Sequence, residues 1–417
     1  MNYDRFVNCV SSRRQPSLVR DFSGQVTPDH VSFAGGCPNP DMFPFASVTV
    51  ALKDGRNLKI DGDLLKKSLQ YGSSEGLPEL INWLKVMQKT LHNPPTWTNK
   101  PEQGGTELCI TTGSQEALSK VCEMLLTNDD TIITNSYVYT GVLDNLRPMG
   151  VRFLTIESDE SGMLPAALFK ALSSFQPTHR PPRVIYIVPN AANPTGVTLT
   201  LERKELIYQI AKEFDLLIIE DDPYYFLQFN KSRIPSFLSL DTDGRVLRAD
   251  SFSKVLSAGL RLGFLTGPKM LVHNVILHVQ VSTMHCNMLS QVLVLQLLQI
   301  WGLEGFLEYT NKVSDFYQGQ RDLMMESAHR WLNGLAEWNN PQGGMFLWIK
   351  LAGITDTYDL VTRKARDNKV LFVPGRAFLP DNTMPSPYVR ASYSLPSQLQ
   401  MDKGLKILAE LLKNVER

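Results

Sequence analysis

Lys254 has neighbours that are unusual for a lysine. The stretch "ADSFSKVLSAGLRLGF", from Ala249 to Phe264, places it directly after Ser-Phe-Ser and seven positions before Arg261. Such a lysine is either an ordinary surface residue or an amine prepared for chemistry, for example as a nucleophile toward an aldehyde. Serine hydroxyls and a guanidinium bind phosphate well, because the guanidinium stays charged and can bind two oxygens at once. The stretch therefore predicts an amine beside a phosphate site.

A carboxylate and two hydrogen-bond donors follow other apolar runs. Asp221 ends "LLIIED", where a carboxylate loses its hydration and requires a cation nearby. Tyr224, three residues later, and Asn193, in "NPTG", can both donate to a ligand oxygen. Each motif also has a structural interpretation, because "NPTG" is a good turn sequence and "DDPYY" can be a strand end followed by a proline turn. Their joint occurrence at successive strand ends favours the functional interpretation.

The segment "TTGSQEAL" opens a predicted helix with Gly113, Ser114 and Gln115. Backbone N–H groups and the dipole at a helix N-terminus favour an anion, although a serine there is often only a helix cap. With the preceding motifs, this segment completes the set of groups that pyridoxal 5'-phosphate (PLP) requires. These are an amine for the aldehyde, a carboxylate for the pyridinium nitrogen, and donors for the phenolate oxygen and the phosphate.

The elements expected to position these groups alternate along the chain. From about residue 105, short β-branched runs alternate with longer helical runs, which is typical of parallel strands joined by helical crossovers. Ligands of such α/β sheets bind beyond the carboxyl ends of the strands. The polar groups lie at four predicted strand ends, namely 111–115, 188–196, 218–225 and 248–254.

The C-terminal part of the chain predicts a second, smaller α+β domain, reached through a long helix across 302–335. Its predicted elements are strands at 343–351, 370–375 and 388–394 and a final helix near 398–415. The expected domains are an N-terminal arm with part of the small domain (1–45), a large PLP-binding domain (46–305) and the small domain (306–417).

The composition excludes several classes of partner. Lys plus Arg equals Asp plus Glu, 42 each in 417 residues, so no global field attracts nucleic acid or a membrane surface. We therefore expect small-molecule substrates. Five cysteines without a Cys-x-x-Cys pair argue against a disulfide or zinc framework, and no metal is expected. No window reaches the about 18 uninterrupted apolar residues of a membrane-spanning helix.

The motifs "NPTG", "DDPYY" and "SFSKVLSAGLRLGF" resemble those of class I aminotransferases, the fold-type I enzymes that use PLP. The similarity covers nearly the whole chain. The stretches "SFAGGCPNPDMFP", "LQYGSSEGLPELINWL" and "GMFLWIK" are similar to the kynurenine/α-aminoadipate aminotransferase branch in particular. The resemblance implies an α/β fold: a large domain with a mostly parallel, seven-stranded type of sheet between helices, and a smaller α+β domain.

Matched position by position, the resemblance implies roles for individual residues. Lys254 is expected to form the Schiff base, Asp221 to bind the pyridine nitrogen, and Asn193 and Tyr224 to contact the phenolate oxygen. Tyr139 in "YVYTG" matches the aromatic residue that stacks on the pyridine ring. The implied phosphate ligands are Ser114, Gln115, Ser251, Ser253 and Arg261.

The resemblance also implies how the substrate is bound. Arg390 in "YVRASYS" matches the arginine that binds the α-carboxylate, and Arg20 and Gly36 match a mobile N-terminal segment that covers the substrate. Tyr71 in "LQYGSSEG" matches a tyrosine that reaches the phosphate of the neighbouring subunit, so a homodimer with shared active sites is implied. The expected substrate contacts also include Asn193, Tyr71 and Tyr139.

The chain departs from the family pattern just before Tyr139. Relatives usually carry an acidic residue and a proline there, whereas this chain has Asn135-Ser136-Tyr137, so Tyr137 can compete for the stacking position. The motif "NAANPTG" also has two alanines where relatives often carry polar residues. Both departures leave the required groups in place and bear on side-chain specificity.

The implied reaction is transamination between an L-amino acid, such as 2-aminoadipate or kynurenine, and a 2-oxo acid such as 2-oxoglutarate, with ping-pong kinetics. Two alternatives stay open: another PLP reaction, such as β-lysis of cysteine conjugates, and a non-catalytic sensor domain. Such sensors carry a winged-helix domain ahead of the PLP fold, and we expect none here because the family-like segment begins by about residue 30. A dehydrogenase is not supported, since the Gly-x-Gly-x-x-Gly turn is missing.

The N-terminus bears on the compartment. The first 20 residues contain four arginines and one aspartate, which weakly matches an organellar transit peptide and equally fits a basic arm that packs on the fold. With the resemblance, this composition predicts the mitochondrial matrix, with the cytoplasm as the alternative.

Overall fold

The computed structural model describes residues 1–19, 29, 31, 33, 35–97, 105–176, 180–230 and 232–414. The chain forms two compact units. Unit 1 comprises residues 1–126 and 238–308, and unit 2 comprises residues 127–237 and 309–417. The domain boundaries after residues 45 and 305 stay a prediction.

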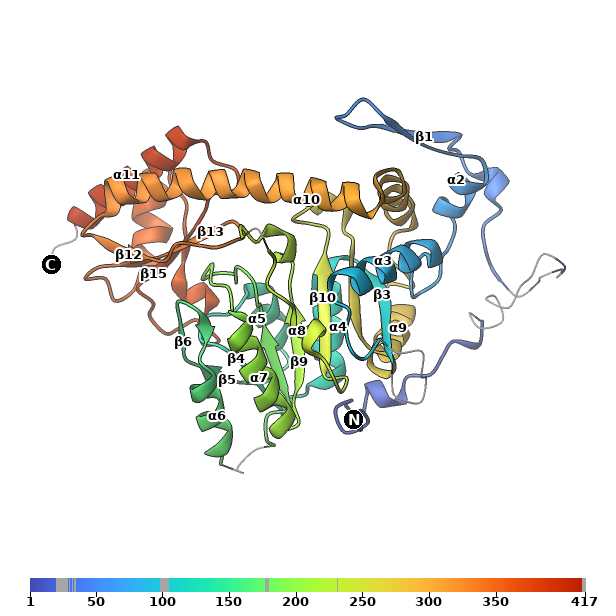
Figure 1. Ribbon diagram of the computed structural model, residues 1–417, viewed down its shortest axis with the longest axis horizontal. Helices are drawn as coiled ribbons and strands as arrows, with labels where there is room; N and C mark the ends of the chain where they lie inside the picture. The colour runs from blue at the N-terminus through green and yellow to red at the C-terminus, as the bar shows by residue number, and fades with distance from the viewer. Residues whose placement is uncertain are drawn as a thin grey trace. The chain divides into compact units, whose positions relative to one another are not determined.

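The main sheet has seven strands, and the fold-type I α/β class expected from the sequence is confirmed (Figure 1). Unit 1 contributes the run β3–β11–β10, and unit 2 contributes the run β9–β8–β4–β5. The strands of unit 1 are β3 (Thr106–Thr111), β10 (Val246–Ser251) and β11 (Gly263–Pro268). Those of unit 2 are β4 (Thr131–Asn135), β5 (Arg152–Ile156), β8 (Val184–Ile187) and β9 (Leu217–Asp221).

Unit 2 has the alternating pattern that the sequence predicts. Its four strands in this sheet are parallel, and every residue of β8 and β9 is buried, because helices of an α/β fold cover both faces of the sheet. The helices between these strands are α5 (Thr140–Leu146), α6 (Pro165–Ser173) and α7 (Leu201–Glu213). The side chain of Thr200 caps α7 by accepting a hydrogen bond from the Arg203 N–H. A small hairpin, β6 (Ser158–Asp159) and β7 (Gly162–Met163), follows β5.

Unit 1 contains an antiparallel element that the alternating pattern does not predict. The strand β11 is antiparallel to both of its neighbours, β3 and β10. The segment from β10 to β11 contains no crossover helix of ordinary length, and a short connection returns the chain antiparallel. The unit also has a hairpin, β1 (Ser47–Ala51) with β2 (Asn57–Asp61). Its helices are α2 (Gly62–Leu69), α3 (Pro78–Leu91), α4 (Gly113–Leu125) and α9 (Lys269–Ser282).

A second sheet, in unit 2, matches most of the predicted C-terminal strands. Its order is β12–β13–β15–β14 and its strands are antiparallel. They are β12 (Ala336–Trp338), β13 (Phe346–Leu351), β14 (Val373–Pro374) and β15 (Tyr388–Ser392). The run predicted as a strand at 370–375 gives only the two residues of β14. The final helix, α11 (Gln398–Lys413), begins with a capping box of Ser397 and Gln400.

The long helix α10 (Met288–Leu332) is kinked at Gly302, where φ is 64° (Figure 1). Its C-terminal end is fastened to α11 because Arg330 and Trp331 both donate to Asp402, at 2.5 and 2.8 Å. Among the residues that the structure describes, α10 is the one helix long and apolar enough to cross a membrane by length and composition alone. That is weak evidence, because the core helices of other proteins meet the same criterion.

Candidate active site

A glycine and an arginine shape the turn between β3 and α4 in unit 1. Gly113 begins α4 with a φ of +73°, and a Cβ atom at this position would lie 2.8 Å from Nη2 of Arg261. Arg261 itself has a left-handed backbone, with φ 49° and ψ 49°. Its guanidinium donates to the Ser253 hydroxyl and to the Thr112 carbonyl, both at 3.3 Å. The N-terminus of α4 and the turn after β10 are therefore linked by one cation.

Gly263 closes the same corner of unit 1, and the sequence reasoning missed it. It is paired with Ser251 on one side and Thr111 on the other, at the start of β11. A Cβ here would lie 2.6 Å from the Asp250 carbonyl oxygen and 2.8 Å from the Ser114 nitrogen, so no side chain fits. The signal that could have found it is the short "GLRLGF" return between two strands.

The predicted phosphate ligands are brought together at this corner. Ser251 ends β10, its hydroxyl accepts from the Ser253 N–H at 3.1 Å, and Ser114 and Gln115 lie in the first turn of α4. Hydroxyls, helix N–H groups and a guanidinium around a cradle that a Cβ would fill are the donor set that a phosphate requires. The residues present therefore fit the phosphate of PLP.

Lys254 lies in the same turn of unit 1, directly after Ser253, and is partly buried. Two other predicted residues of this unit lie on the surface of the single chain. Tyr71 is 54% exposed and makes an edge contact with the His285 ring at 6.0 Å, and Gly36 is exposed. Arg20 lies outside the described residues.

In unit 2, Asp221 is held by a residue that the sequence reasoning also missed. Asp221 is the last residue of β9 and is 3% exposed. The Tyr186 hydroxyl, on the neighbouring strand β8, donates to Asp221 Oδ2 at 2.7 Å within a buried environment. A tyrosine inside the buried run "VIYI" was the available signal, because a buried phenol usually finds a hydrogen-bond partner. A buried carboxylate that accepts this hydrogen bond fits a protonated pyridine nitrogen.

Removing the Tyr186 hydroxyl tests this arrangement. We expect Tyr186→Phe to weaken PLP binding about tenfold or more, because a hydrogen bond to a charged group contributes about 1.5–3 kcal/mol and its loss makes the Asp221 carboxylate less stable. Titration of the apoprotein with PLP, followed by absorbance, measures this change. The control is Tyr3→Phe, which also loses a buried hydroxyl bond, to the Gly244 carbonyl at 2.9 Å. Equal losses in both variants would contradict the role of Tyr186.

Arg390 and Asn193 meet in unit 2 although 197 positions separate them. Arg390 Nη1 donates to Asn193 Oδ1 at 2.7 Å, and the guanidinium lies over the rings of Phe346 and Phe378 at 4.2 and 5.0 Å. Burial lowers the pKa of Arg390, yet a guanidinium still stays charged at neutral pH. The buried Nε has no hydrogen-bond partner among the described residues, so the donors of this cation are only partly satisfied.

Two tyrosines of unit 2 belong to the predicted site residues. Tyr224 is buried, and burial, followed by the charge of Asp221, raises the pKa of its hydroxyl well above the usual value. The hydroxyl therefore stays protonated and can donate a hydrogen bond. Tyr139 directly precedes α5 and lies close enough to influence the pKa values of both Tyr224 and Arg390.

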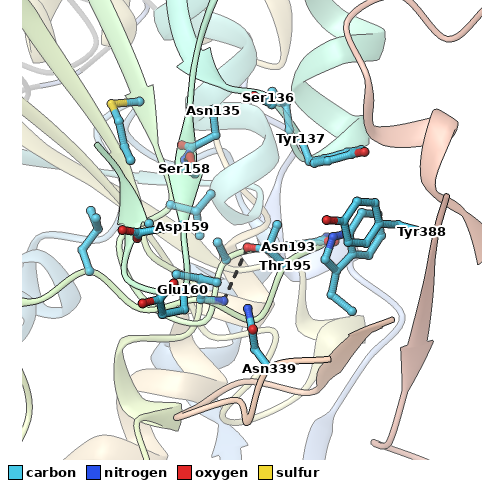
Figure 2. A pocket seen from close by; sticks show the side chains of 18 of the residues that line it. Asn135, Ser136, Tyr137, Ser158, Asp159, Glu160, Asn193, Thr195, Asn339 and Tyr388 are labelled. Atoms are coloured by element: carbon cyan, nitrogen blue, oxygen red, sulfur yellow. Dashed lines mark hydrogen bonds between the residues drawn. The ribbon is translucent and has the colours of Figure 1, made fainter. Parts of the chain in front are cut away.

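Tyr137 does not occupy the same place as Tyr139. Its ring makes edge contacts with Trp348 and Tyr388, at 5.0 and 5.3 Å, and its hydroxyl shares a hydrogen bond of 3.0 Å with Ser386. It lines a cavity of about 350 Å³ in unit 2, where Tyr137 and Tyr388 lie on one side (Figure 2). The cavity is also lined by Asn135, Ser136, Tyr139, Ser158, Asp159, Glu160, Asn193, Thr195, Asn339 and Lys350.

Comparison with known proteins identifies the family. The model of the family "aminotransferase class I and II" matches residues 40–408. The chain belongs to this family. It is an enzyme that uses PLP and acts on amino acids and 2-oxo acids. The roles of its individual residues stay predictions.

Individual relatives are similar over their whole length. The mitochondrial kynurenine/alpha-aminoadipate aminotransferase of Mus musculus is 48% identical over 422 residues, which cover 99% of each chain. Among solved structures, aminotransferase Aro8 of Candida albicans has a TM-score of 0.87 at 27% identity and covers 99% of this chain and 98% of its own. The kynurenine aminotransferase of Pyrococcus horikoshii, solved with PMP, has a TM-score of 0.78 at 27% identity and covers 100% and 99%.

Proposed function

We propose that this aminotransferase transfers the amino group of 2-aminoadipate, kynurenine and a broad range of other L-amino acids to a 2-oxo acid such as 2-oxoglutarate. The names of the mouse and archaeal relatives support this substrate class. The observation that carries the proposal is Arg390, a partly buried cation whose donors are only partly satisfied, joined to Asn193 in the unit that also holds Asp221. One unit thus offers an anion for the pyridinium and a cation for the substrate carboxylate.

The residues of each unit have separate tasks in this proposal. In unit 1, the phosphate is held by Ser114, Gln115, Ser251, Ser253 and Arg261. In unit 2, Asp221 keeps the ring nitrogen protonated, Tyr224 and Asn193 donate to the phenolate oxygen, and Tyr139 covers the ring. Arg390 binds the α-carboxylate, with Asn193 holding its Nη1.

The chemical step requires a proton carrier. When bound, PLP supplies an electron sink for the charge that develops at Cα. Lys254 Nζ would take the proton from Cα and return it as the acid in the same half-reaction. Tyr224 keeps its hydroxyl proton throughout, since burial raises its pKa. Because the amino group would stay with the enzyme when the first product leaves and pass to the second substrate, the kinetics would be ping-pong.

The partner subunit and the compartment are further parts of the proposal. Tyr71, with 54% of its surface exposed in the single chain, is free to reach the phosphate of a second copy, which supports a homodimer with shared sites. Arg20 and Gly36 are included as substrate contacts on the sequence resemblance alone. The mouse relative is named mitochondrial, and with the arginine-rich start this supports the mitochondrial matrix, with the cytoplasm as the alternative.

A panel assay tests the proposed function. Purified protein with PLP is given single amino acids and 2-oxoglutarate, and turnover is followed spectroscopically. We expect 2-aminoadipate and kynurenine to react, with parallel lines in double-reciprocal plots. Lack of turnover with every amino acid of the panel would contradict the proposal. Ammonia and pyruvate released from a cysteine conjugate, without need of an oxo acid, would support β-elimination instead.

A further inference from the structure

The loop that carries Tyr139 is attached to the C-terminal sheet of unit 2 at several points. We propose that Tyr137 is a positioning residue that fixes this loop relative to Arg390 and so sets the affinity for the substrate carboxylate. The inference rests on the proposed function, because it assigns Arg390 to the carboxylate and Tyr139 to the ring. It concerns the stretch Asn135-Ser136-Tyr137, which lies just before Tyr139.

Tyr137 and Val138 attach the loop to neighbouring segments of unit 2. The Tyr137 hydroxyl and the Ser386 hydroxyl share a hydrogen bond of 3.0 Å, and the ring of Tyr137 packs edge-on against Trp348 and Tyr388. The next residue, Val138, donates its N–H to the Phe378 carbonyl at 2.8 Å. The ring of Tyr137 therefore packs on β13 and β15, while the two hydrogen bonds bind the loop to the segments beside them, at Ser386 just before β15 and at Phe378 in the short 3-10 helix Gly375–Phe378. Figure 2 shows Tyr137 directed toward Tyr388 at the side of the cavity.

Aromatic residues connect Tyr137 to Arg390. Trp348 on β13 stands directly opposite Arg390 on β15, and its ring stacks on Tyr388 at 5.0 Å with an interplanar angle of 5°. Phe378 makes an edge contact with Trp348 at 5.6 Å and lies under the Arg390 guanidinium at 5.0 Å. Tyr137 thus contacts Trp348 and Tyr388. Trp348 in turn contacts Phe378, which packs against the Arg390 guanidinium.

Removal of the Tyr137 ring is expected to loosen the packing around Arg390. Aromatic rings pack in defined edge-on and offset geometries, so removing one leaves its neighbours free to shift. Loss of the Tyr137 ring should act on the substrate carboxylate, bound through Arg390, and leave the phosphate site of unit 1 unaffected.

The experiment compares the holoenzyme with Tyr137→Leu. We expect KM for the amino acid and for the oxo acid to rise about tenfold, while kcat changes less than about threefold and the affinity for PLP changes less than about threefold. In the apoprotein, hydrogen exchange at the Val138 amide should become about tenfold faster. Tyr137→Phe keeps the ring contacts and should restore KM to within about threefold of the wild type.

The matched control is Phe169→Leu, which removes an aromatic residue of unit 2 that pairs with Phe214 at 5.6 Å outside this cluster. It should alter neither KM nor exchange at Val138. A double-mutant cycle of Tyr137→Phe with Ser386→Ala adds a test of the shared hydrogen bond. The KM change of the double variant should be smaller than the product of the changes in the two single variants.

The outcomes separate the inference from the proposed function. A wild-type protein without turnover contradicts the proposed function, and exchange at Val138 then still reports whether Tyr137 fastens the loop. An active wild type whose KM is unchanged by Tyr137→Leu overturns the inference, as does unchanged exchange at Val138. A large loss of PLP affinity in Tyr137→Leu with unchanged KM would also overturn it, because the effect would then lie at the cofactor.

Discussion

Replacing Lys254 with alanine will reduce kcat for transamination by about 1000-fold or more. General acid–base catalysis by a positioned side chain contributes about 10²–10⁴-fold, and this variant also loses the covalent bond between the enzyme and its cofactor. The serines and Arg261 around this turn remain, so PLP should still bind through its phosphate.

Two measurements check the Lys254→Ala variant. Stopped-flow turnover with kynurenine and 2-oxoglutarate gives kcat, and the absorption spectrum shows whether the band of the lysine–cofactor bond is lost. The control is Lys53→Ala, an exposed lysine of unit 1, which should behave as the wild type. Normal turnover in Lys254→Ala would show that another amine carries the proton.

Replacing Arg390 with alanine will raise KM for the amino acid about 100-fold. The variant removes the cation proposed to pair with the substrate carboxylate; losing one partner of such a desolvated charge pair costs about 2–5 kcal/mol, and 3 kcal/mol is about 100-fold. Asn193 Oδ1 also loses its donor, and the cation between Phe346 and Phe378 is removed. PLP should stay bound because its proposed ligands do not include Arg390.

Steady-state kinetics and a PLP titration distinguish the outcomes for Arg390. The variant Arg390→Lys keeps the charge and loses the two-pronged geometry, so its KM should fall between those of the wild type and the alanine variant. Arg366→Ala, an exposed arginine of unit 2, is the neutral control. Loss of PLP without a change in KM would place the carboxylate site elsewhere.

The sequence predicted strand ends well because their signals are local. The buried run before Asp221 and the alternation around β8 and β9 are visible in single stretches of the chain. The antiparallel course of β11 was not predicted, since a short return between strands leaves no periodic pattern. The run at 370–375 is apolar but gives only the two paired residues of β14, because pairing depends on a neighbouring strand and not on composition.

In the candidate site too, local signals were predicted and contacts between distant segments were not. Family motifs indicated Lys254 and Arg390, each within a contiguous stretch. The partners Tyr186 and Gly263 were missed because their importance comes from neighbours across the sheet: Tyr186 through Asp221, and Gly263 through Asp250 and Ser114. The contact between Arg390 and Asn193 joins segments 197 residues apart, and no spacing rule predicts it.

The hydrogen bond from Arg390 fixes the orientation of the Asn193 side-chain amide. Its oxygen accepts from Arg390 at 2.7 Å, so its nitrogen, the only donor on the side chain, must face the other way. A substrate carboxylate bound by the Arg390 guanidinium would change the strength of the hydrogen bond from Arg390 to Asn193 Oδ1. Polarisation of the amide would then change how strongly Nδ2 donates. If the proposed roles hold, Arg390 and the phenolate oxygen would share one amide, so binding of the carboxylate at one end would be felt by the cofactor at the other.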